Sequence, residues 1–386
     1  MSFVLNDNPE IWKGFLPLTF TRPLSEIRVG ILTIKEKWEK HLGTGGFYHT
    51  QDYLQQKYKN FNSEALVIYS HICPDKELVT ALRALKPGEA LYAKEELIAF
   101  YGKATDVKNS STFNRVNHSK DIFSVRNVWD IFQKNAEAVK SDFILLTEGK
   151  TSLPLSKSVT VIGDASQIFL EKGARMEACI VNTTGGPVYL GEDAEMMEGA
   201  IVRGPFALCE HSTLKMGAKV YGATTIGPHC KVGGEVSNSV IFGYSNKAHD
   251  GFLGNSVLGE WCNLGADTNN SNLKNNYSNV KLFNYLHNKQ IDSGLQFCGL
   301  IMGDHSKSGI NTMFNTGTVV GVGCNIYGGG FPPTHVPNFS WGGSEGLEAY
   351  KLEKLFETAE RVFERRGMKF TDLEKDILKA VSMERG

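Results

Sequence analysis

The chain carries almost no net charge and has no long apolar run. Lys plus Arg number 41 and Asp plus Glu number 42, which gives a formal charge of −1 at pH 7. A balance so close to zero argues against nucleic acid or an anionic membrane surface as the main partner. No stretch approaches the ~20 apolar residues of a membrane-spanning helix, and the start MSFVLNDNPE has no basic n-region of a signal peptide. We therefore predict a cytoplasmic protein that binds neither nucleic acid nor membrane.

The seven cysteines contain no C-x-x-C pair. Without that spacing neither a zinc site nor a redox motif is indicated, so we name no metal ligand and favour a reducing compartment. A free Cys that does not react behaves as a small apolar residue. This interpretation suits the three cysteines that fall in the small-residue position of the repeat described next, which are Cys230, Cys262 and Cys324.

A six-residue repeat dominates the middle of the chain. A period of six fits neither an α-helix nor a simple strand. It fits a triangular prism, in which each hexapeptide forms one flat face and the stacked coils pair in parallel ladders. A second, mostly small series lies two residues before the aliphatic one, and the pattern returns between Met302 and Ile326. The inward-facing positions are Leu190, Met196, Val202, Leu208, Leu214, Val220, Ile226 and Val232.

The repeat loses its phase in the Asn- and Lys-rich segment 268–297. A loop that leaves a rigid scaffold is a natural place for a binding site, because its side chains stay free while the scaffold holds them. The alternative is a solvated excursion without a function of its own.

Residues 1–156 lack the repeat and alternate between strand-like and helix-like segments. Continuous apolar runs predict buried strands, and amphipathic stretches closed by Gly or Pro predict helices. This alternation is typical of an α/β layer domain. The predicted strands are 3–5, 65–69 and 90–93, and the predicted helices are 29–42, 75–85 and 128–139, with 142–146 as a docking segment.

After a repeat domain at 157–343, residues 344–386 form a predicted helical tail. A long amphipathic helix is expected over 344–366, and a capping box at 371–374 opens a last short helix. Such helices are expected to cover the open end of the prism. The alternative is that the tail holds an anionic cofactor through Arg365, Arg366 and Lys369.

The segment Leu16-Pro17-Leu18-Thr19-Phe20-Thr21-Arg22-Pro23 resembles the signature of sugar nucleotidyltransferases. In that family a Gly-rich loop precedes it, whereas here the first strand runs into Asn6-Asp7-Asn8-Pro9. Bulky residues keep a backbone from cradling phosphates. The family's metal-holding Asp is also missing, since Tyr69 is followed by Ser70 and His71. The resemblance implies a Rossmann-like but degenerate domain; if it is active, it needs Mg²⁺, with Arg22, Arg28 and Lys35 near phosphate.

The segment Asn246–Gly254, continued by 263–266 and 271–272, resembles the acetyltransferase half of the bifunctional N-acetylglucosamine-1-phosphate uridylyltransferase/glucosamine-1-phosphate acetyltransferase family. The chain as a whole resembles a shortened, Bacteroidetes-type branch of that family, which implies a left-handed parallel β-helix. The resemblance implies His249 as the catalytic base. It assigns substrate contacts to Asn263, Asn272, Lys247 and Lys274, and coenzyme contacts to Gly265, Ala266 and Asn272.

These residue types suit acyl transfer. A His with a near-neutral pKa accepts a proton from an amine or hydroxyl, and Asn side chains donate and accept hydrogen bonds at once. Phe252 stands where the family has a phosphate-contacting Tyr, and Asp267 and Leu273 also depart from its pattern.

The resemblance implies acetyl-CoA as cofactor, a sugar phosphate or nucleotide sugar as substrate, and a homotrimer. Two alternatives stay open. One is a sugar-1-phosphate nucleotidyltransferase whose prism serves only to trimerise the chain. The other is a non-catalytic scaffold that binds a nucleotide sugar.

Overall fold

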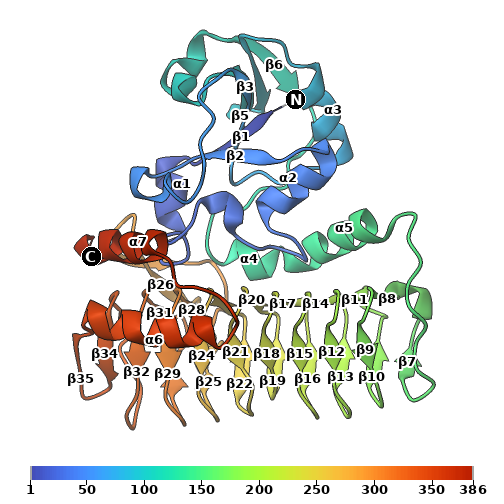
Figure 1. Cartoon of the computed structure of the whole chain (residues 1–386), viewed down its shortest axis with the longest axis vertical. Coiled ribbons are helices and arrows are strands. Elements are labelled where there is room, and N and C mark those ends of the chain that lie inside the picture. Colours follow the sequence, from blue (N-terminus) through green and yellow to red (C-terminus); the bar gives the residue numbers. More distant parts are fainter. Residues whose placement is uncertain (1, 385–386) are drawn as a thin grey trace.

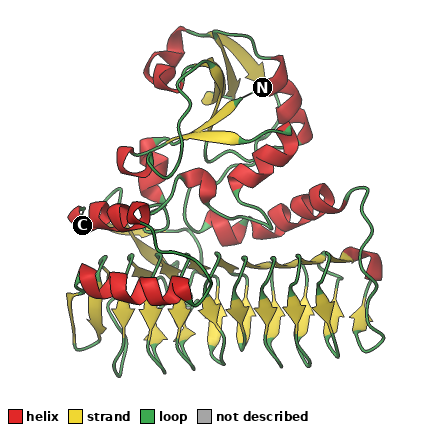
Figure 2. Cartoon of the chain, in the orientation of Figure 1, coloured by secondary structure: helices red, strands yellow, loops and turns green. Residues whose placement is uncertain are grey.

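The computed structural model describes residues 2–384. It shows an α/β domain above a long prism of parallel strands, with two C-terminal helices beside them (Figures 1 and 2). The predicted fold class, a Rossmann-like α/β domain joined to a left-handed parallel β-helix with helices after it, is confirmed. None of the helices between residues 2 and 384 has both the length and the apolar character that crossing a bilayer requires.

The prism has three sheets, of six, nine and ten strands, to which successive coils contribute in turn. The first sheet contains β7 (Thr160–Ile162), β10 (Ile180–Asn182), β13 (Ile201–Arg203), β16 (Lys219–Tyr221), β19 (Glu235–Ser237) and β22 (Phe252–Gly254). The second contains β8 (Ile168–Leu170), β11 (Val188–Leu190), β14 (Phe206–Leu208), β17 (Thr224–Ile226), β20 (Val240–Ile241), β23 (Val257–Leu258), β28 (Ile301–Met302), β31 (Val319–Val320) and β33 (His335–Val336). The third contains β9 (Arg175–Met176), β12 (Glu195–Met196), β15 (Thr213–Leu214), β18 (Lys231–Val232), β21 (Asn246–Lys247), β24 (Asn263–Leu264), β29 (Lys307–Ser308), β32 (Asn325–Ile326), β34 (Ser340–Gly343) and β35 (Gly346–Ala349).

The six-residue pattern sets this stacking. Leu190 pairs with Leu208 in the next coil, and Met196 pairs with Leu214. The eight aliphatic residues predicted to face inward are all buried. Each removes an apolar side chain from water, which favours folding by about 1.5–3 kcal/mol per residue before the entropy cost is counted. The repeat therefore specifies both the fold and its register.

One corner of the prism carries a stack of rings in left-handed backbone conformations. His229, Tyr244 and Trp261 have φ angles of 57°, 61° and 61°. The ring centroids of His229 and Tyr244 lie 4.8 Å apart, and those of Tyr244 and Trp261 lie 4.2 Å apart. Phe363 of α6 (Leu352–Glu364) adds a further ring, 3.9 Å from Trp261. This stack holds α6 along the side of the prism.

The tail thus differs from the prediction in two ways. Its first residues form β35, which pairs antiparallel with β34, and the helix begins only at Leu352. Helix α6 lies beside the coils instead of over their open end (Figure 1). The predicted capping box is present at Thr371 and opens α7 (Asp372–Met383).

The interruption at 268–297 begins later than predicted. β25 (Asn269–Asn270) still pairs with β30 (Met313–Phe314) as part of a coil. The excursion then forms a hairpin of β26 (Lys281–Asn284) and β27 (Lys289–Asp292). Its Tyr285 ring packs edge-on to Phe20 of the first domain, with centroids 5.4 Å apart. At least this part of the excursion contacts the α/β domain.

The α/β domain has one six-stranded sheet, in the order β2-β1-β3-β5-β4-β6. The three predicted strands are present, whereas β2, β5 and β6 were not predicted. The sheet is mixed, since β3 is parallel to β1 and antiparallel to β5. The strands are β1 (Phe3–Asn6), β2 (Gly46–His49), β3 (Ala65–Tyr69), β4 (Glu89–Ala93), β5 (Glu96–Gly102) and β6 (Asn114–His118).

Two of the predicted helices have different bounds, and the one expected over 128–139 is divided at Lys134 into α4 (Asp130–Gln133) and α5 (Asn135–Thr147). The helix expected over 29–42 begins at Ile34, because Thr33 caps it and Gly30 adopts a φ of 82°. The docking segment expected at 142–146 is part of a longer helix, α5, which follows directly on α4. The helices of this domain are α1 (Pro9–Gly14), α2 (Ile34–Leu42), α3 (Lys76–Ala84), α4 (Asp130–Gln133) and α5 (Asn135–Thr147).

A buried ion pair joins the two domains. Arg22 contacts Asp304 of the prism, and its Nη1 lies 3.1 Å from Glu260 Oε1. Thr21 Oγ1 donates to Asp304 Oδ2 at 2.6 Å. Burial alone would lower the pKa of Arg22, but the carboxylates of Asp304 and Glu260 raise it well above its usual value. Arg22 is therefore held charged between the domains.

We predict that Arg22→Ala destabilises the protein by about 3–5 kcal/mol, because it leaves the buried Asp304 carboxylate without its counter-charge. Denaturant unfolding measures the loss. Arg115→Ala, which removes an exposed partner of Glu95, is the control and should cost less than about 1 kcal/mol. Equal losses in the two variants would contradict a domain-joining role for Arg22.

Candidate functional site

A groove of about 630 Å³ runs between the prism and the C-terminal end of α6. Four residues predicted for the acyl-transfer site line it, namely His249, Asn263, Gly265 and Ala266. They come from two successive coils, since β21 pairs with β24 and Asn246 lies opposite Asn263. The structure thus brings the predicted base together with two of the three predicted coenzyme contacts, Gly265 and Ala266.

The polar floor of this groove follows from the strand alternation of the third sheet. Successive side chains of a strand point to opposite faces. Lys231, Asn246, Asn263 and Lys307 occupy matching positions in neighbouring strands. Each stands directly before an inward-facing residue, so each points outward. The groove therefore has a regular row of hydrogen-bonding and cationic groups along one side.

The groove is positively charged. Lys231, Lys307, Arg365 and Arg366 line it, and none of its lining residues within 2–384 is an Asp or Glu. Arg366 Nη2 donates to Asn246 Oδ1 at 3.4 Å, which ties the end of α6 to the prism floor. Burial lowers the pKa of Lys307, and a bound anion would raise it again. These groups fit the phosphates of a coenzyme, and the apolar surfaces of Trp261, Ile310 and Val362 fit its uncharged arm.

Lys231 and Lys307 were not among the site residues predicted from the sequence. The signal was available in the repeat, because each precedes an inward position of the same face. The expectation that Arg365 and Arg366 face an anionic ligand agrees with their place in the groove, whereas Lys369 does not line it.

Lys247 lies inside the prism, although the resemblance assigned it to substrate. Its residue is only 1% exposed and occupies an inward position. Its Nζ donates to Gly233 O at 3.1 Å and to His249 O at 2.9 Å. Burial, partly offset by Asp250, lowers the pKa of Lys247 to about 8. This side chain does not reach a ligand; it holds the backbone of the corner that presents His249.

Asn272 and Lys274 lie on another flank of the prism and do not line the groove. Asn272 Nδ2 donates to Asn255 Oδ1 at 2.8 Å. Lys274 Nζ donates to Asn279 O at 2.9 Å within the excursion. Phe252 and Asn272 both approach the α-carbon side of Gly254. Asn272 therefore lies against β22, the strand that follows His249, and away from the groove.

The cations predicted for the first domain have protein partners. Arg28 is buried, contacts Ile31 O, and lies 3.7 Å from Glu36. Lys35 Nζ lies 2.6 Å from Glu39. Together with the interface position of Arg22, these contacts mean that the three cations do not converge on one phosphate site.

The end of β1, where a nucleotide loop would lie, is filled by protein. Asn8 caps α1 directly after the strand. Asp7 accepts hydrogen bonds from Leu24 N at 3.2 Å and Thr50 Oγ1 at 2.5 Å, and burial raises its pKa to about 6. Among residues 2–384 no three His, Cys, Asp or Glu side chains are placed to hold a metal ion. The Asp7 carboxylate at this strand end is taken up by Leu24 and Thr50 and is therefore not open to a Mg²⁺ ion.

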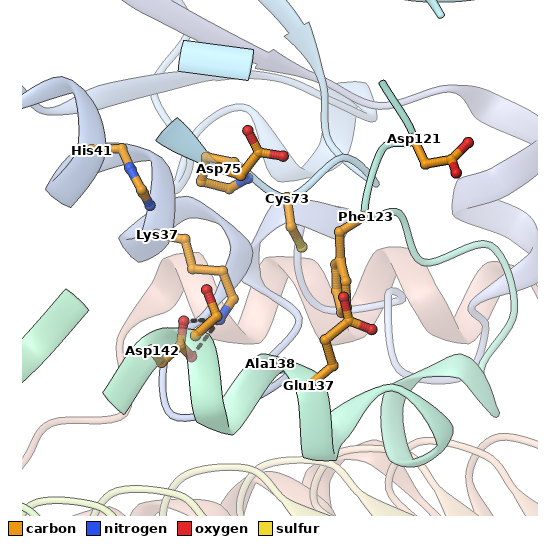
Figure 3. A pocket seen from close by; sticks show the side chains of 11 residues that line it. Lys37, His41, Cys73, Asp75, Asp121, Phe123, Glu137, Ala138 and Asp142 are labelled. Carbon is orange, nitrogen blue, oxygen red and sulfur yellow. Dashed lines mark hydrogen bonds and ion pairs between the residues drawn. The ribbon is translucent and has the colours of Figure 1, made fainter. Parts of the chain in front are cut away.

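Figure 3 shows a smaller cavity of about 160 Å³ between α2 and α5. Lys37 and Asp142 pair with each other there. Asp142 also accepts from Ile31 N at 2.8 Å and Leu32 N at 3.1 Å. Because these charges are matched within the protein, they fix α5 against the α/β domain.

Known proteins resemble this chain over parts of its length. Residues 3–151 match the family model described as sugar nucleotidyl transferase. A bifunctional sugar-1-phosphate nucleotidylyltransferase/acetyltransferase from Sulfurisphaera tokodaii is 32% identical over 146 residues, which cover 37% of this chain and 36% of that protein. The bifunctional protein GlmU from Methanocaldococcus jannaschii is 36% identical over 92 residues, covering 24% and 22%. The relationship that the motifs indicated is confirmed, although the chain spans well under two thirds of either relative.

Solved structures were compared as well. A UDP-N-acetylglucosamine acyltransferase from Campylobacter jejuni is 12% identical, with a TM-score of 0.24, over 60% of this chain and 97% of that one.

We predict that Lys247→Met changes how stability depends on pH. The folded protein releases the Lys247 proton near pH 8, whereas an unfolded lysine keeps it to about pH 10.5. Between these values the unfolded chain binds more protons, so the wild type gains stability relative to the variant as pH rises. The difference in the pKa of Lys247 between the folded and unfolded states corresponds to about 3 kcal/mol in the free energy of unfolding.

Urea unfolding of both proteins at pH 7.5, 9 and 10.5 measures this difference. A difference that stays constant with pH would show that Lys247 is not held as described.

Proposed function

We propose that this relative of bifunctional nucleotidyltransferase/acetyltransferase proteins transfers an acetyl group from acetyl-CoA to an amino sugar or to its phosphate or nucleotide derivative. The observation that carries the proposal is the groove itself. It joins His249 and Asn263 to four cations, and no Asp or Glu of the described part of the chain lines it. A site of this charge favours a polyanionic coenzyme and places it beside a candidate base.

The residues that line the groove would have three different roles in the reaction. Acetyl-CoA would supply the acyl group as a thioester. Arg365, Arg366, Lys231 and Lys307 would bind its phosphates. The imidazole of His249 would accept the proton of the acceptor amine or hydroxyl as that atom attacks the thioester carbonyl, and would pass a proton to the coenzyme thiolate that is released when the carbon–sulfur bond breaks. The Asn263 carboxamide donates to and accepts from sugar hydroxyls and so orients the acceptor.

The position of the base depends on the buried Lys247. Its ammonium donates to the carbonyl of His249, which leaves the imidazole exposed at the groove. Because the corner is fixed in this way, the imidazole of His249 stays in one position during the reaction. This favours the rate more than an additional contact from a flexible side chain would.

A second candidate, nucleotidyl transfer in the first domain, is favoured by the family match over residues 3–151. Against it stand the filled end of β1 and the protein partners of Arg22 and Arg28. The chain's activity, if it resides there, would release pyrophosphate from a nucleoside triphosphate.

We infer further that the chain assembles as a homotrimer through its first prism sheet. Ile180 and Ile201 lie opposite each other in neighbouring strands and are 38% and 45% exposed. Ile162 on the same sheet is 47% exposed. Light scattering should give about three times the chain mass of 42.6 kDa. Ile180→Lys with Ile201→Lys should reduce it, and a monomeric wild type would contradict the inference.

We predict that His249→Ala lowers the rate of acetyl transfer by about 10²–10⁴-fold while coenzyme binding changes little, because the change removes the base and no cation. His287→Ala, at an exposed turn of the excursion, is the control and should keep full activity. Titration with acetyl-CoA and assays with amino sugars and their phosphates measure both properties.

Two outcomes would count against the proposal. One is transfer that persists in the His249 variant. The other is a wild type that binds no coenzyme but releases pyrophosphate from nucleoside triphosphates with Mg²⁺, which would move the function to the first domain.

A further inference from the structure

A second cavity, of about 390 Å³, lies at the opposite end of α6 from the groove. The β34–β35 hairpin supplies Trp341 and Ala349, and the segment after it supplies Tyr350 and Lys351. The other wall is one side of α6, with Lys354, Glu357, Thr358 and Arg361. Tyr350 packs beside Trp341, with ring centroids 4.8 Å apart. Trp341 is half-buried, so part of its ring faces the cavity. The cavity therefore offers an aromatic surface together with polar groups.

Helix α6 separates its charges by side. Residues advance about 100° per step around an α-helix. Lys354, Thr358, Arg361 and Arg365 consequently share one stripe, and each lines one of the two cavities. The carboxylates occupy a separate stripe, which contains Glu353, Glu357, Glu360 and Glu364. Only Glu357 of these lines a cavity, and it pairs with Lys354 at 3.0 Å.

Two cations of the second cavity are available for a ligand. Lys351 and Arg361 are exposed, and within residues 2–384 neither has a carboxylate within ion-pair distance. Lys351 is also the N-cap of α6 and gives it no side-chain cap. The unbonded N–H groups of a helix's first turn favour an anion at that end. The charge of Lys351 and the orientation of α6 thus both favour an anionic ligand at the start of the helix.

The two cavities lie along one row of the prism. Lys307 pairs with Asn325 in the next coil, and Asn325 pairs with Trp341 in the coil after it. Neighbouring coils are about 4.8 Å apart, so the aromatic surface lies roughly 10 Å beyond the last cation of the groove floor. Arg361 and Arg365 of α6 run beside this row. The cationic stripe is continuous between the two cavities.

We propose that the second cavity binds a nucleoside phosphate group. Its base packs on Trp341 and Tyr350, and its phosphates lie along α6 between Lys351 at the start of the helix and Arg361 in its last turn. Aromatic rings accept bases of any identity on their faces, while the paired cations select for phosphate. The group has two possible sources, a nucleotide sugar or the nucleotide end of a coenzyme whose other end lies in the groove. This inference does not depend on acyl transfer.

The test is calorimetric titration of the full-length protein with adenosine diphosphate, uridine diphosphate and coenzyme A. Lys351→Gln/Arg361→Gln should weaken binding of at least one nucleoside diphosphate about tenfold or more. The control, Lys157→Gln/Lys172→Gln, removes two exposed charges at the far end of the prism and should change affinity less than twofold. Trp341→Phe should retain more affinity than Trp341→Leu, because it keeps a ring for the base to pack on.

The three probes distinguish the sources. If affinity for coenzyme A and adenosine diphosphate falls together and the two compete, the group is the nucleotide end of the coenzyme. If uridine diphosphate binds without competing and coenzyme affinity is unchanged, the group belongs to a nucleotide sugar. The proposal is overturned if no probe binds at millimolar concentration, or if binding is equal in the two double variants. His249→Ala should bind the probes normally, so lost transfer with retained binding separates this site from the proposed activity.

Discussion

The register of the coils is the constraint on which the rest of this structure depends. Each inward side chain packs on its counterpart one coil away, as Leu190 does on Leu208. Once this packing is fixed, every outward residue has a fixed neighbour too. The groove floor is the result: Asn246, Asn263 and Lys307 meet because their inward neighbours must stack. The packing of the core thus sets the positions of the surface residues that form the proposed site.

The α/β domain and the tail depend on the same corner of the prism. Glu260 and Asp304, which hold Arg22, directly precede Trp261 and His305 in the ring stack. Helix α6 is held on the other side of that stack by Phe363. The domain, the prism and the groove wall therefore meet at a few adjacent residues. A change that loosens this corner would affect all three parts together.

The sequence was most informative where the structure is periodic. The inward positions from Leu190 to Val232 could be predicted because a repeat reports the same environment many times. The part of the site around His249 and Asn263 followed from the motif resemblance and the phase. Long-range pairing was not accessible: nothing local in Thr21 or Arg22 indicates that their partner lies at Asp304, since such contacts form only when the domains dock. The burial of Lys247 was missed for a related reason, because a lysine at an inward position contradicts the polarity rule that defines the repeat.

The α/β domain shows the same limit in another form. Its edge strands, such as β6 with its polar residues Asn114 and Arg115, lack the apolar run that marked β3. The helix start at Ile34 depended on the capping contact of Thr33, which outweighed the apolar pattern upstream.

The matched row from Lys307 through Asn325 to Trp341 also sets fixed distances along the prism. These distances are multiples of the spacing between neighbouring coils, which is about 4.8 Å. A point substitution changes which group is bound at one coil but not the distance between coils. Descendants of this chain that needed a longer or shorter molecule in the groove would have to gain or lose a complete coil, which leaves the core packing intact while it resets the span.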